Sequence, residues 1–311
     1  MTQKNKSKFP FNVQILGANS ALPANNRFPS SQVLTLQDQL FLIDCGEGTQ
    51  IQLSKYGIRR NKIDQIFISH LHGDHVFGLA GLIASYNHFG RSNDLDVNGP
   101  PGIEEMIQTQ LRCSGTHVNF KLTFKEFDPS KHTLIFENKI IEVFTIPLHH
   151  RVPTAGFLFK EKSLARNISK DKITEYQLSI DQIKRIKNGD GVVLPEKGFI
   201  DSDYFLKEAL ATRSYAYCSD TAYKPDIVPL IRNVDVVYHE TTFTEVYKDR
   251  AKITLHSTAK EAAMIAKAAH ASKLITGHYS SRYAILDPIL EEAKSVFENT
   301  ELGIEGRVYE I

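Results

Sequence analysis

Four side chains able to bind a metal ion fall within six residues, His70 to His75, which read His-Leu-His-Gly-Asp-His. Three imidazoles and a carboxylate, with no thiolate nearby, are typical donors for a catalytic zinc or a related first-row metal ion. The apolar run from Ile63 to Ser69 predicts a buried strand before the cluster. A helical pattern follows it, at Val76, Leu79, Leu82 and Ile83. The cluster is therefore expected on a strand-to-helix turn, where Gly73 permits a tight bend. A surface histidine run with a helix-capping aspartate is the alternative for this stretch alone.

Further potential ligands follow other predicted strands. They are His149-His150, Asp220, His239-Glu240 and His278. A lone histidine at a strand end is more often structural. Five such positions in an alternating β/α chain instead favour strand ends that converge on one rim. We expect a two-metal site there, bridged by an aspartate.

The composition is that of an ordinary globular enzyme, with 41% apolar and 23% charged residues among 311. This length fits one large domain or two small ones. The net charge of +1 lacks the surplus of a typical nucleic-acid binder, so RNA contact would need a local basic patch. Three widely spaced cysteines and the absence of an apolar span favour a cytoplasmic protein without a membrane segment. Residues 1–8 form a polar, basic lead.

Strands and helices alternate loosely in both halves of the chain. Residues 160–210 differ, being rich in Lys, Asp and Asn with weak periodicity. We interpret them as an excursion from one domain rather than a second core. Strands are predicted near residues 12–16, 32–36, 40–43, 63–69, 95–98, 122–124, 134–136, 140–145, 155–159, 214–218, 234–238 and 273–276. Helices are predicted near 49–56, 103–111, 257–269 and 288–297.

Seven segments, spread over about residues 12–300, carry a specific resemblance. They are Asp44 to Gln50, His70 to His75, Asn98 to Pro100, Pro147 to Arg151, His239 to Phe243, His256 to Thr258, and His278 to Tyr283. Together they resemble the metallo-β-lactamase superfamily and, within it, the ribonuclease Z family of tRNA 3′-processing endonucleases. The resemblance implies an αββα sandwich, with residues 1–311 forming a single domain and 160–210 its projecting arm.

The resemblance also implies which residues hold two Zn²⁺ ions per subunit, with Mn²⁺ or another divalent ion as an alternative. One ion would bind His70, His72 and His150; the other would bind Asp74, His75 and His278. Asp220 would bridge the two. His150 is preferred over His149 because it precedes Arg151, as in the family pattern. Asp44 would orient a ligand imidazole; its alternative role is a helix cap near Glu47.

The implied reaction is attack of a metal-activated hydroxide on a phosphodiester of precursor tRNA, with no nucleotide cofactor. Asp74 would accept the proton of the attacking water. His256, polarised by Glu240, would protonate the leaving 3′-oxygen. The alternative for this segment is a helix cap at Ser257 with His256 exposed. The family also implies a homodimer, in which the arm of one subunit serves the other's active site.

Two departures from the family pattern concern substrate binding. The loop Pro23 to Phe28 keeps Arg27, but Asn25 and Phe28 stand where relatives carry Lys and Asn. The arm lacks the usual Gly-Pro motif, although lysines and Arg185 are expected to make it basic. Arg27 and Arg282 are the candidate substrate-binding arginines.

Three alternatives to tRNA processing remain. One is a hydrolase of small phosphodiesters or lactones on the same scaffold; the altered loop and arm keep this alternative open, whereas the His-Glu and His-Ser-Thr segments argue against it. A second is an RNA-binding or structural protein with a vestigial site, which seven potential ligands disfavour. The third is a redox metalloprotein, although no flavin-binding module is evident.

Overall fold

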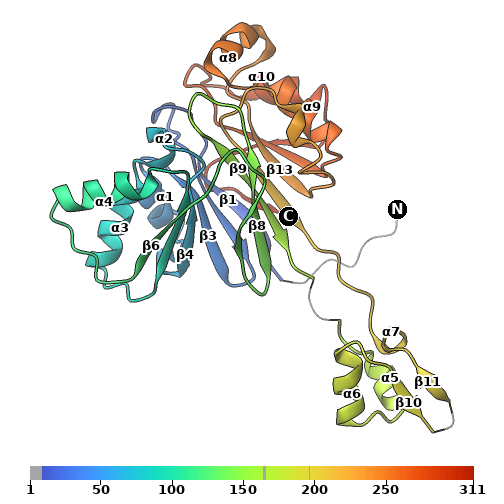
Figure 1. Ribbon diagram of the computed structural model, residues 1–311. Helices are drawn as coiled ribbons and strands as arrows, with labels where there is room; N and C mark the ends of the chain where they lie inside the picture. Colours follow the sequence, from blue (N-terminus) through green and yellow to red (C-terminus); the bar gives the residue numbers. More distant parts are fainter. Residues whose placement is uncertain (1–8, 164–165, 196) are drawn as a thin grey trace. The chain divides into compact units, whose positions relative to one another are not determined.

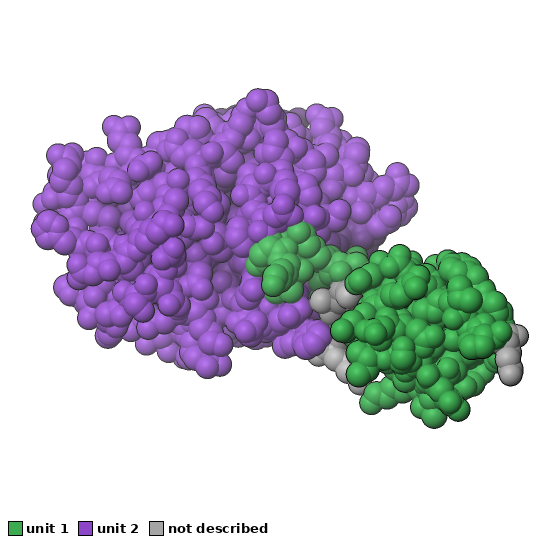
Figure 2. Space-filling view, turned by 60° about the horizontal axis from the view of Figure 1, so that its bottom comes forward, with its two compact units in different colours: residues 1–8, 138–141, 161–212 green, residues 9–137, 142–160, 213–311 purple. Residues whose placement is uncertain are grey.

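The computed structural model describes residues 9–163, 166–195 and 197–311, so the expected lead of residues 1–8 lies outside the described part. The chain divides into two compact units (Figure 2). The larger unit contains Phe9–Glu137, Glu142–Lys160 and Arg213–Ile311, and the smaller contains Asn138–Ile141 and Glu161–Thr212. Among the described residues, no helix combines the length and apolar character needed to span a membrane.

The first sheet of the larger unit has seven strands in the order β16-β1-β2-β3-β4-β5-β6 (Figure 1). Pairing is antiparallel from β16 to β3 and parallel from β3 to β6. The predicted hairpin of β2 and β3 is present. Its bend places Gln37 at φ 56°. The strands are β1 Phe11–Gly17, β2 Ser31–Leu36, β3 Gln39–Cys45, β4 Ile63–Phe67, β5 Leu95–Gly99, β6 Leu122–Glu126 and β16 Val308–Glu310.

The second sheet has the order β15-β14-β13-β12-β9-β8-β7, with parallel pairing from β12 to β15. The sequence predicted that β13 ends at Tyr238, but the strand continues through His239 and Glu240, which pair with Thr276 and Gly277. Backbone pairing therefore extends past the apolar pattern. The strands are β7 Leu134–Glu137, β8 Ile141–Pro147, β9 Ala155–Glu161, β12 Ser214–Cys218, β13 Val236–Glu240, β14 Lys273–Gly277 and β15 Thr300–Leu302.

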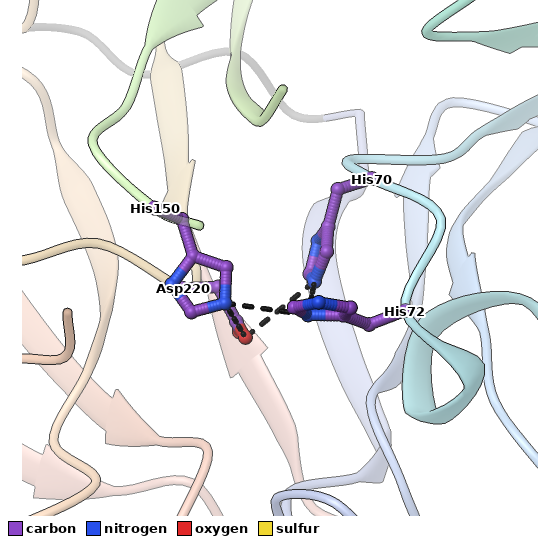
Figure 3. Close-up of side chains that lie close together, drawn as sticks. All are labelled: His70, His72, His150 and Asp220. Atoms are coloured by element: carbon purple, nitrogen blue, oxygen red, sulfur yellow. Dashed lines mark hydrogen bonds and ion pairs between the residues drawn. The ribbon is translucent and has the colours of Figure 1, made fainter. Parts of the chain in front are cut away.

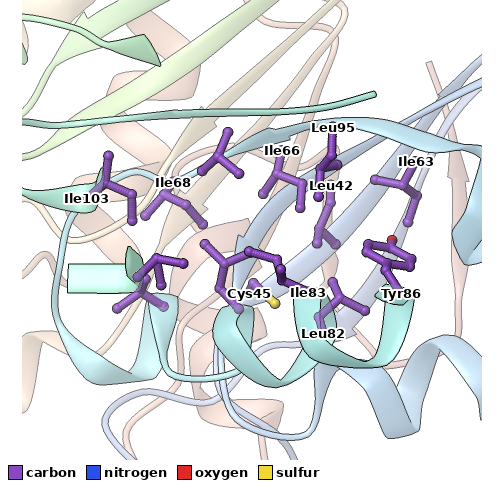
Figure 4. Packing of buried hydrophobic residues seen from close by; sticks show 14 of the residues in the cluster. Leu42, Cys45, Ile63, Ile66, Ile68, Leu82, Ile83, Tyr86, Leu95 and Ile103 are labelled. Atoms are coloured by element: carbon purple, nitrogen blue, oxygen red, sulfur yellow. The ribbon is translucent and has the colours of Figure 1, made fainter. Parts of the chain in front are cut away.

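Helices cover the outer face of each sheet (Figure 1). On the first sheet these are α1 Thr49–Lys55, α3 Leu79–His88 and α4 Ile103–Cys113, with the short α2 Gly73–Val76 between β4 and α3. Figure 4 shows Leu82, Ile83 and Tyr86 of α3 packed against the sheet, where Leu42 and Ile66 are also fully buried. On the second sheet, α9 Ala259–Ala268 packs on β13, β14 and α10 Asp287–Lys294. The remaining helices of this unit are α8 Lys248–Thr254 and the 3-10 turns η1 Arg60–Lys62, η2 Pro225–Ile227 and η3 Glu245–Tyr247.

Aromatic side chains fill the space between the two sheets. Phe41 and Phe67 of the first sheet contact Phe136, Phe157 and Phe159 of the second, with ring centroids 5.4–6.3 Å apart. Each fully buried ring contributes roughly 1.5–3 kcal/mol of burial free energy. The layers are helix, sheet, sheet and helix, which confirms the predicted αββα sandwich. Both sheets are thereby held face to face, which fixes the rim where their strands end.

The smaller unit has a hydrophobic core of its own, in contrast to the excursion without a core that we expected. Its core consists of Ile168, Leu178, Ile186, Val192, Leu194 and Phe205. Ile168 and Leu178 lie between elements and the other four come from short elements, so no long apolar period indicated this core. Residues 160–210 contain ten basic and nine acidic side chains, so the segment as a whole is close to neutral rather than basic. Its elements are α5 Lys170–Glu175, α6 Ile180–Lys187, β10 Val192–Leu194, β11 Gly198–Ile200 and α7 Ser202–Phe205.

Candidate metal centre and active site

The turn after β4 carries four of the predicted ligands. β4 leads through buried Ser69 to His70, and α2 begins directly after His72. The turn is held against the end of β3, where the Gly78 N–H donates to the Cys45 carbonyl at 2.9 Å. A Cβ at Gly78 would lie 2.2 Å from the Gly46 carbonyl oxygen. Glycine is therefore required for this close backbone crossing.

His70, His72 and His150, the first ligand group, point their ring nitrogens toward one another (Figure 3). His72 Nδ1 lies 3.0 Å from His70 Nε2 and 3.3 Å from His150 Nε2. Burial lowers the pKa of all three imidazoles, so they are neutral near pH 7. Neutral imidazole is the form that binds a metal ion. His149, the neighbouring alternative, is exposed.

Asp74, His75 and His278 form the second ligand group. His278 Nε2 lies 3.3 Å from His75 Nε2 and 3.4 Å from Asp74 Oδ2. Burial opposes a charge on His75, but the carboxylates of Asp220, Asp44 and Asp74 raise its pKa well above the usual value. These carboxylates thus favour positive charge at this point. A bound metal cation would satisfy the same preference.

Asp220 lies between the two groups. Its Oδ2 is 3.5 Å from His70 Nε2 and from His150 Nε2. Its Oδ1 is 3.1 Å from His75 Nε2 and 3.0 Å from His278 Nε2. One oxygen therefore faces each group, which is the arrangement a bridging carboxylate requires.

The donor set fits a pair of divalent metal ions. With bonds of about 2.0–2.1 Å in a tetrahedral site, neighbouring ligand atoms lie roughly 3.3 Å apart. The nitrogen and oxygen atoms described above are separated by 3.0–3.5 Å. Such convergence of imidazole nitrogens and carboxylate oxygens indicates a divalent-metal site.

Asp44 makes a network of contacts beneath the second ligand group. Its Oδ2 lies 2.7 Å from His75 Nδ1 and accepts a hydrogen bond from Tyr217 Oη at 2.6 Å. Its Oδ1 accepts from the Ser69 N–H at 2.7 Å. The cap of α1 is Gly48, so Asp44 is not a helix cap. The carboxylate is placed to orient the imidazole of His75.

Glu240 and His256 lie beside both ligand groups. Glu240 Oε1 is 2.9 Å from His256 Nδ1 and accepts the Thr221 N–H at 2.6 Å. Burial opposes protonation of His256, but the Glu240 carboxylate and its hydrogen bond raise the pKa of His256 to about 9. The side chain of His256 is 11% exposed, and Thr258 rather than Ser257 caps α9. The alternative of an exposed His256 beside a capping Ser257 is therefore wrong.

The side chains meet at a pocket of about 330 Å³. The predicted residues His72, Asp74, His150, Asp220, His256 and His278 line it, together with Ser20, Ala21, Pro29, Glu47, Gly73, Phe77 and Arg151. Arg151 and Phe77 were not among the predicted site residues. Arg151 lies within a segment that resembles the ribonuclease Z family, and Phe77 lies two residues after another such segment. The sequence did not show that these two side chains line the pocket.

Neither candidate substrate-binding arginine lines this pocket. Arg27 is half-buried; its Nε donates to Asn19 Oδ1 at 3.2 Å, and its guanidinium also donates to the Tyr283 carbonyl. Arg282 is exposed and lies over the rings of Phe243 and Tyr247, at 5.1 and 4.4 Å from their centroids. Arg27 thus ties its loop to residues 279–283, and any substrate contact by either arginine lies outside the pocket.

Comparisons with known proteins agree with this geometry. A ribonuclease Z from Parabacteroides distasonis is 43% identical over 296 residues, covering 95% of this chain and 97% of the relative. The crystal structure of human tRNase Z, short form, matches with 25% identity and a TM-score of 0.70, covering 96% of this chain and 99% of the other. The metallo-β-lactamase fold protein YhfI from Bacillus subtilis has 20% identity and a TM-score of 0.69, covering 98% and 100%. A family model described as "Anti-Pycsar protein Apyc1" matches residues 11–187.

The fold is of the metallo-β-lactamase type, and the donor set is that of a divalent-metal site. Within that class, the chain belongs to the ribonuclease Z family, and its residues 11–187 also belong to the family described by the Apyc1 model. The protein is therefore a hydrolytic nuclease that acts on phosphodiester bonds. This confirms the family and the reaction type predicted from the sequence.

Proposed function

We propose that this protein is an endoribonuclease that removes the 3′ trailer from precursor tRNA with two zinc ions per subunit. The family supports this substrate, since the relatives described above are named ribonuclease Z and tRNase Z. In this proposal the first ligand group would hold one ion, the second ligand group would hold the other, and Asp220 would offer one carboxylate oxygen to each. When bound, the ions supply positive charge that stabilises the transition state of phosphodiester hydrolysis and lowers the pKa of the attacking water.

The chain's own residues then move the protons. Asp74 is the proposed acceptor of the proton that the attacking water releases. Burial disfavours its charge, but His75 and His278 hold the pKa of Asp74 well below its usual range. Its Oδ2 accepts the Ala21 N–H at 2.7 Å, which fixes the carboxylate at the pocket wall.

His256 is the proposed general acid. Its Nδ1 is engaged by Glu240, which leaves Nε2 as the nitrogen able to protonate the leaving 3′-oxygen. Thr242 Oγ1 also donates to Glu240 Oε2, and the Ser257 N–H donates to the same oxygen at 3.1 Å. Glu240 is thus held in position by several donors, and it can stabilise the protonated imidazole before transfer.

The observation that carries the proposal is the Glu240–His256 pair at 2.9 Å, in which His256 lines the same 330 Å³ pocket as residues of both ligand groups and Glu240 lies buried behind it. A metal centre alone supports attack on many esters. A polarised acid beside it is what a poor leaving group, such as a ribose 3′-oxygen, requires.

The test is cleavage of a defined precursor tRNA by the purified protein loaded with zinc. Wild type is expected to cut next to the discriminator nucleotide. His256→Ala is expected to lose about 10²–10⁴-fold in the single-turnover rate while retaining both ions by elemental analysis. His149→Ala is the matched control, because that histidine is exposed beside a ligand and is expected to leave the rate unchanged.

A hydrolase of small phosphodiesters is the second candidate function. The loop with Asn25 and Phe28 and the arm without a Gly-Pro motif favour it, because both departures concern RNA contacts. Wild type that hydrolyses a chromogenic phosphodiester but leaves precursor tRNA intact would establish this alternative. Equal loss of both activities in His256→Ala would instead show one site serving two substrates.

We further propose that the protein acts as a cytoplasmic homodimer, in which residues 160–210 form a tRNA-binding arm. Arg27 and Arg282 would contact phosphates outside the pocket. Light scattering after size-exclusion chromatography tests the dimer. Replacing Lys184, Arg185 and Lys187 at the end of α6 together by Ala tests the arm; we expect a raised KM for precursor tRNA and an unchanged rate with a small phosphodiester.

A further inference from the structure

The catalytic pocket has two unlike walls. Loops of the second sheet contribute His150, Arg151 and His256, which are polar or cationic. Loops of the first sheet contribute Ala21, Pro29 and Phe77, which are apolar, beside Glu47. The ligand groups lie between these walls. A substrate whose phosphate occupies the centre therefore meets histidine and arginine side chains on one side. On the other side it meets a mixed surface, in which Ala21, Pro29 and the ring of Phe77 lie beside Ser20 and Glu47.

Phe77 is the aromatic side chain on the first-sheet wall. Phe77 is 64% exposed, although the preceding residues of α2, His75 and Val76, are fully buried. Its N–H donates to the Gly73 carbonyl at 2.9 Å. A Cβ at Gly73 would lie 2.2 Å from Phe77 Cε2, so the ring rests directly on the glycine backbone. The ring is thus fixed against the turn that follows β4, while most of its surface faces solvent.

We propose that Phe77 is a stacking platform for the base of the first trailer nucleotide, directly downstream of the scissile phosphate. This inference rests on the proposed function. His256 protonates the 3′-oxygen of the upstream nucleotide, which places that nucleotide toward the wall formed by the second sheet. The downstream nucleotide is then left facing the first-sheet wall, where Phe77 offers the aromatic surface. Bases of single-stranded RNA stack on such rings with little regard to sequence, which suits trailers that differ between precursors.

The test is a cycle that combines a protein variant with an abasic substrate. Single-turnover kcat/KM is measured for wild type and Phe77→Ala on precursor tRNA that carries either a normal or an abasic first trailer nucleotide. Loss of one stacked base corresponds to about a tenfold decrease. We expect each single change to cost about tenfold and the combination to cost no more than either alone. Phe77→Tyr, which keeps the ring, is expected to stay within about twofold of wild type.

Two controls isolate the contact. Phe89→Ala removes an aromatic side chain of similar exposure, 59%, that does not line the pocket, and it is expected to leave kcat/KM unchanged. An abasic nucleotide upstream of the scissile phosphate is expected to combine multiplicatively with Phe77→Ala.

Independent, multiplying effects of Phe77→Ala and the abasic trailer nucleotide would overturn the inference. Coupling to the upstream nucleotide instead would also overturn it. Both results presuppose that wild type cleaves the precursor. Wild type that fails to cleave it would overturn the proposed function itself, so the two failures are distinguishable.

Discussion

The two ligand groups share Asp220 but are held in different ways. In the first ligand group, outer partners are neutral: His150 Nδ1 lies 3.0 Å from the Leu255 carbonyl, and His70 Nδ1 lies 3.0 Å from Ser69 Oγ. In the second ligand group, His75 Nδ1 faces the buried carboxylate of Asp44 at 2.7 Å. A carboxylate behind an imidazole raises its basicity and fixes its orientation more strongly than a neutral acceptor does.

The second ligand group is also connected to the residues proposed for proton transfer. His278 Nδ1 lies 3.0 Å from Thr242 Oγ1, and that hydroxyl donates to Glu240. Asp74 in turn accepts the Ala21 N–H of the loop that precedes β2. Asp44 thus contacts the second ligand group directly through His75, and Glu240 reaches it through Thr242. The comparison teaches that outer carboxylates support the second ligand group, whereas backbone and hydroxyl groups support the first.

The largest expected effect comes from the residue that both groups share. Asp220→Asn removes the charge that lies between them, and an amide offers only one oxygen for the two sites. We expect loss of at least one ion and a decrease in cleavage of about 10³-fold or more. Elemental analysis and single-turnover rates measure both. Asp226→Asn is the control, because Asp226 is exposed on η2. Full occupancy of both sites in Asp220→Asn would contradict the bridging role.

A smaller effect is expected from Glu240→Gln, which acts on the proton rather than on the ions. The Glu240 carboxylate holds the pKa of His256 at about 9 against the opposing effect of burial. A general acid must be protonated, so cleavage declines as pH rises through that pKa. Removing the negative charge lowers the pKa, and the decline is expected to move at least about one unit toward lower pH.

The pH–rate profile at saturating zinc measures this shift. The loss in Glu240→Gln should therefore be large near pH 8 and small near pH 6. Thr242→Ser keeps the hydroxyl that bridges Glu240 and His278, so it should leave the profile in place. A uniform loss at every pH would show that Glu240 only supports the local structure.

The sequence indicated potential ligands because they follow apolar strands, and the resemblance to the ribonuclease Z family implied how they divide between two ions. It predicted strands and helices because alternation and helical spacing describe how each element is buried. The sequence did not predict the backbone geometry at the site. Asp44, Asp220 and His278 all have left-handed backbone conformations, with φ of 55°, 60° and 56°. Non-glycine residues rarely adopt this region, and no local pattern announces it.

Contacts between residues that are far apart in the sequence were also not predicted. Nothing in the order of residues shows that Tyr217, 173 positions away, donates to Asp44, or that Phe77 rests on Gly73 beside the pocket. The core of the smaller unit was not predicted, because its apolar residues are divided among short elements, none longer than eight residues, and the segments between them. Apolar periodicity is informative over long elements, and the elements of the smaller unit are too short to display a period.

The comparison between the two ligand groups is tested most directly by a substitution that affects only the second group. Asp44→Asn keeps the size of the side chain but removes the charge behind His75. Loss of such an outer partner typically costs 10–100-fold in metal affinity. We expect this loss at the second site only, while the first site keeps its affinity, because His70 and His150 retain their neutral partners.

Stepwise zinc titration against a competing chelator separates the two affinities. Tyr217→Phe is the matched variant, since it removes one hydrogen bond to Asp44 and leaves the carboxylate charged. It should weaken the second site by less than about tenfold. If the charge of Asp44 is what distinguishes the two groups, Asp44→Asn must exceed Tyr217→Phe at the second site and match it at the first. Equal weakening of both sites by Asp44→Asn would mean instead that Ser69, which contacts both Asp44 and His70, couples the groups into one unit.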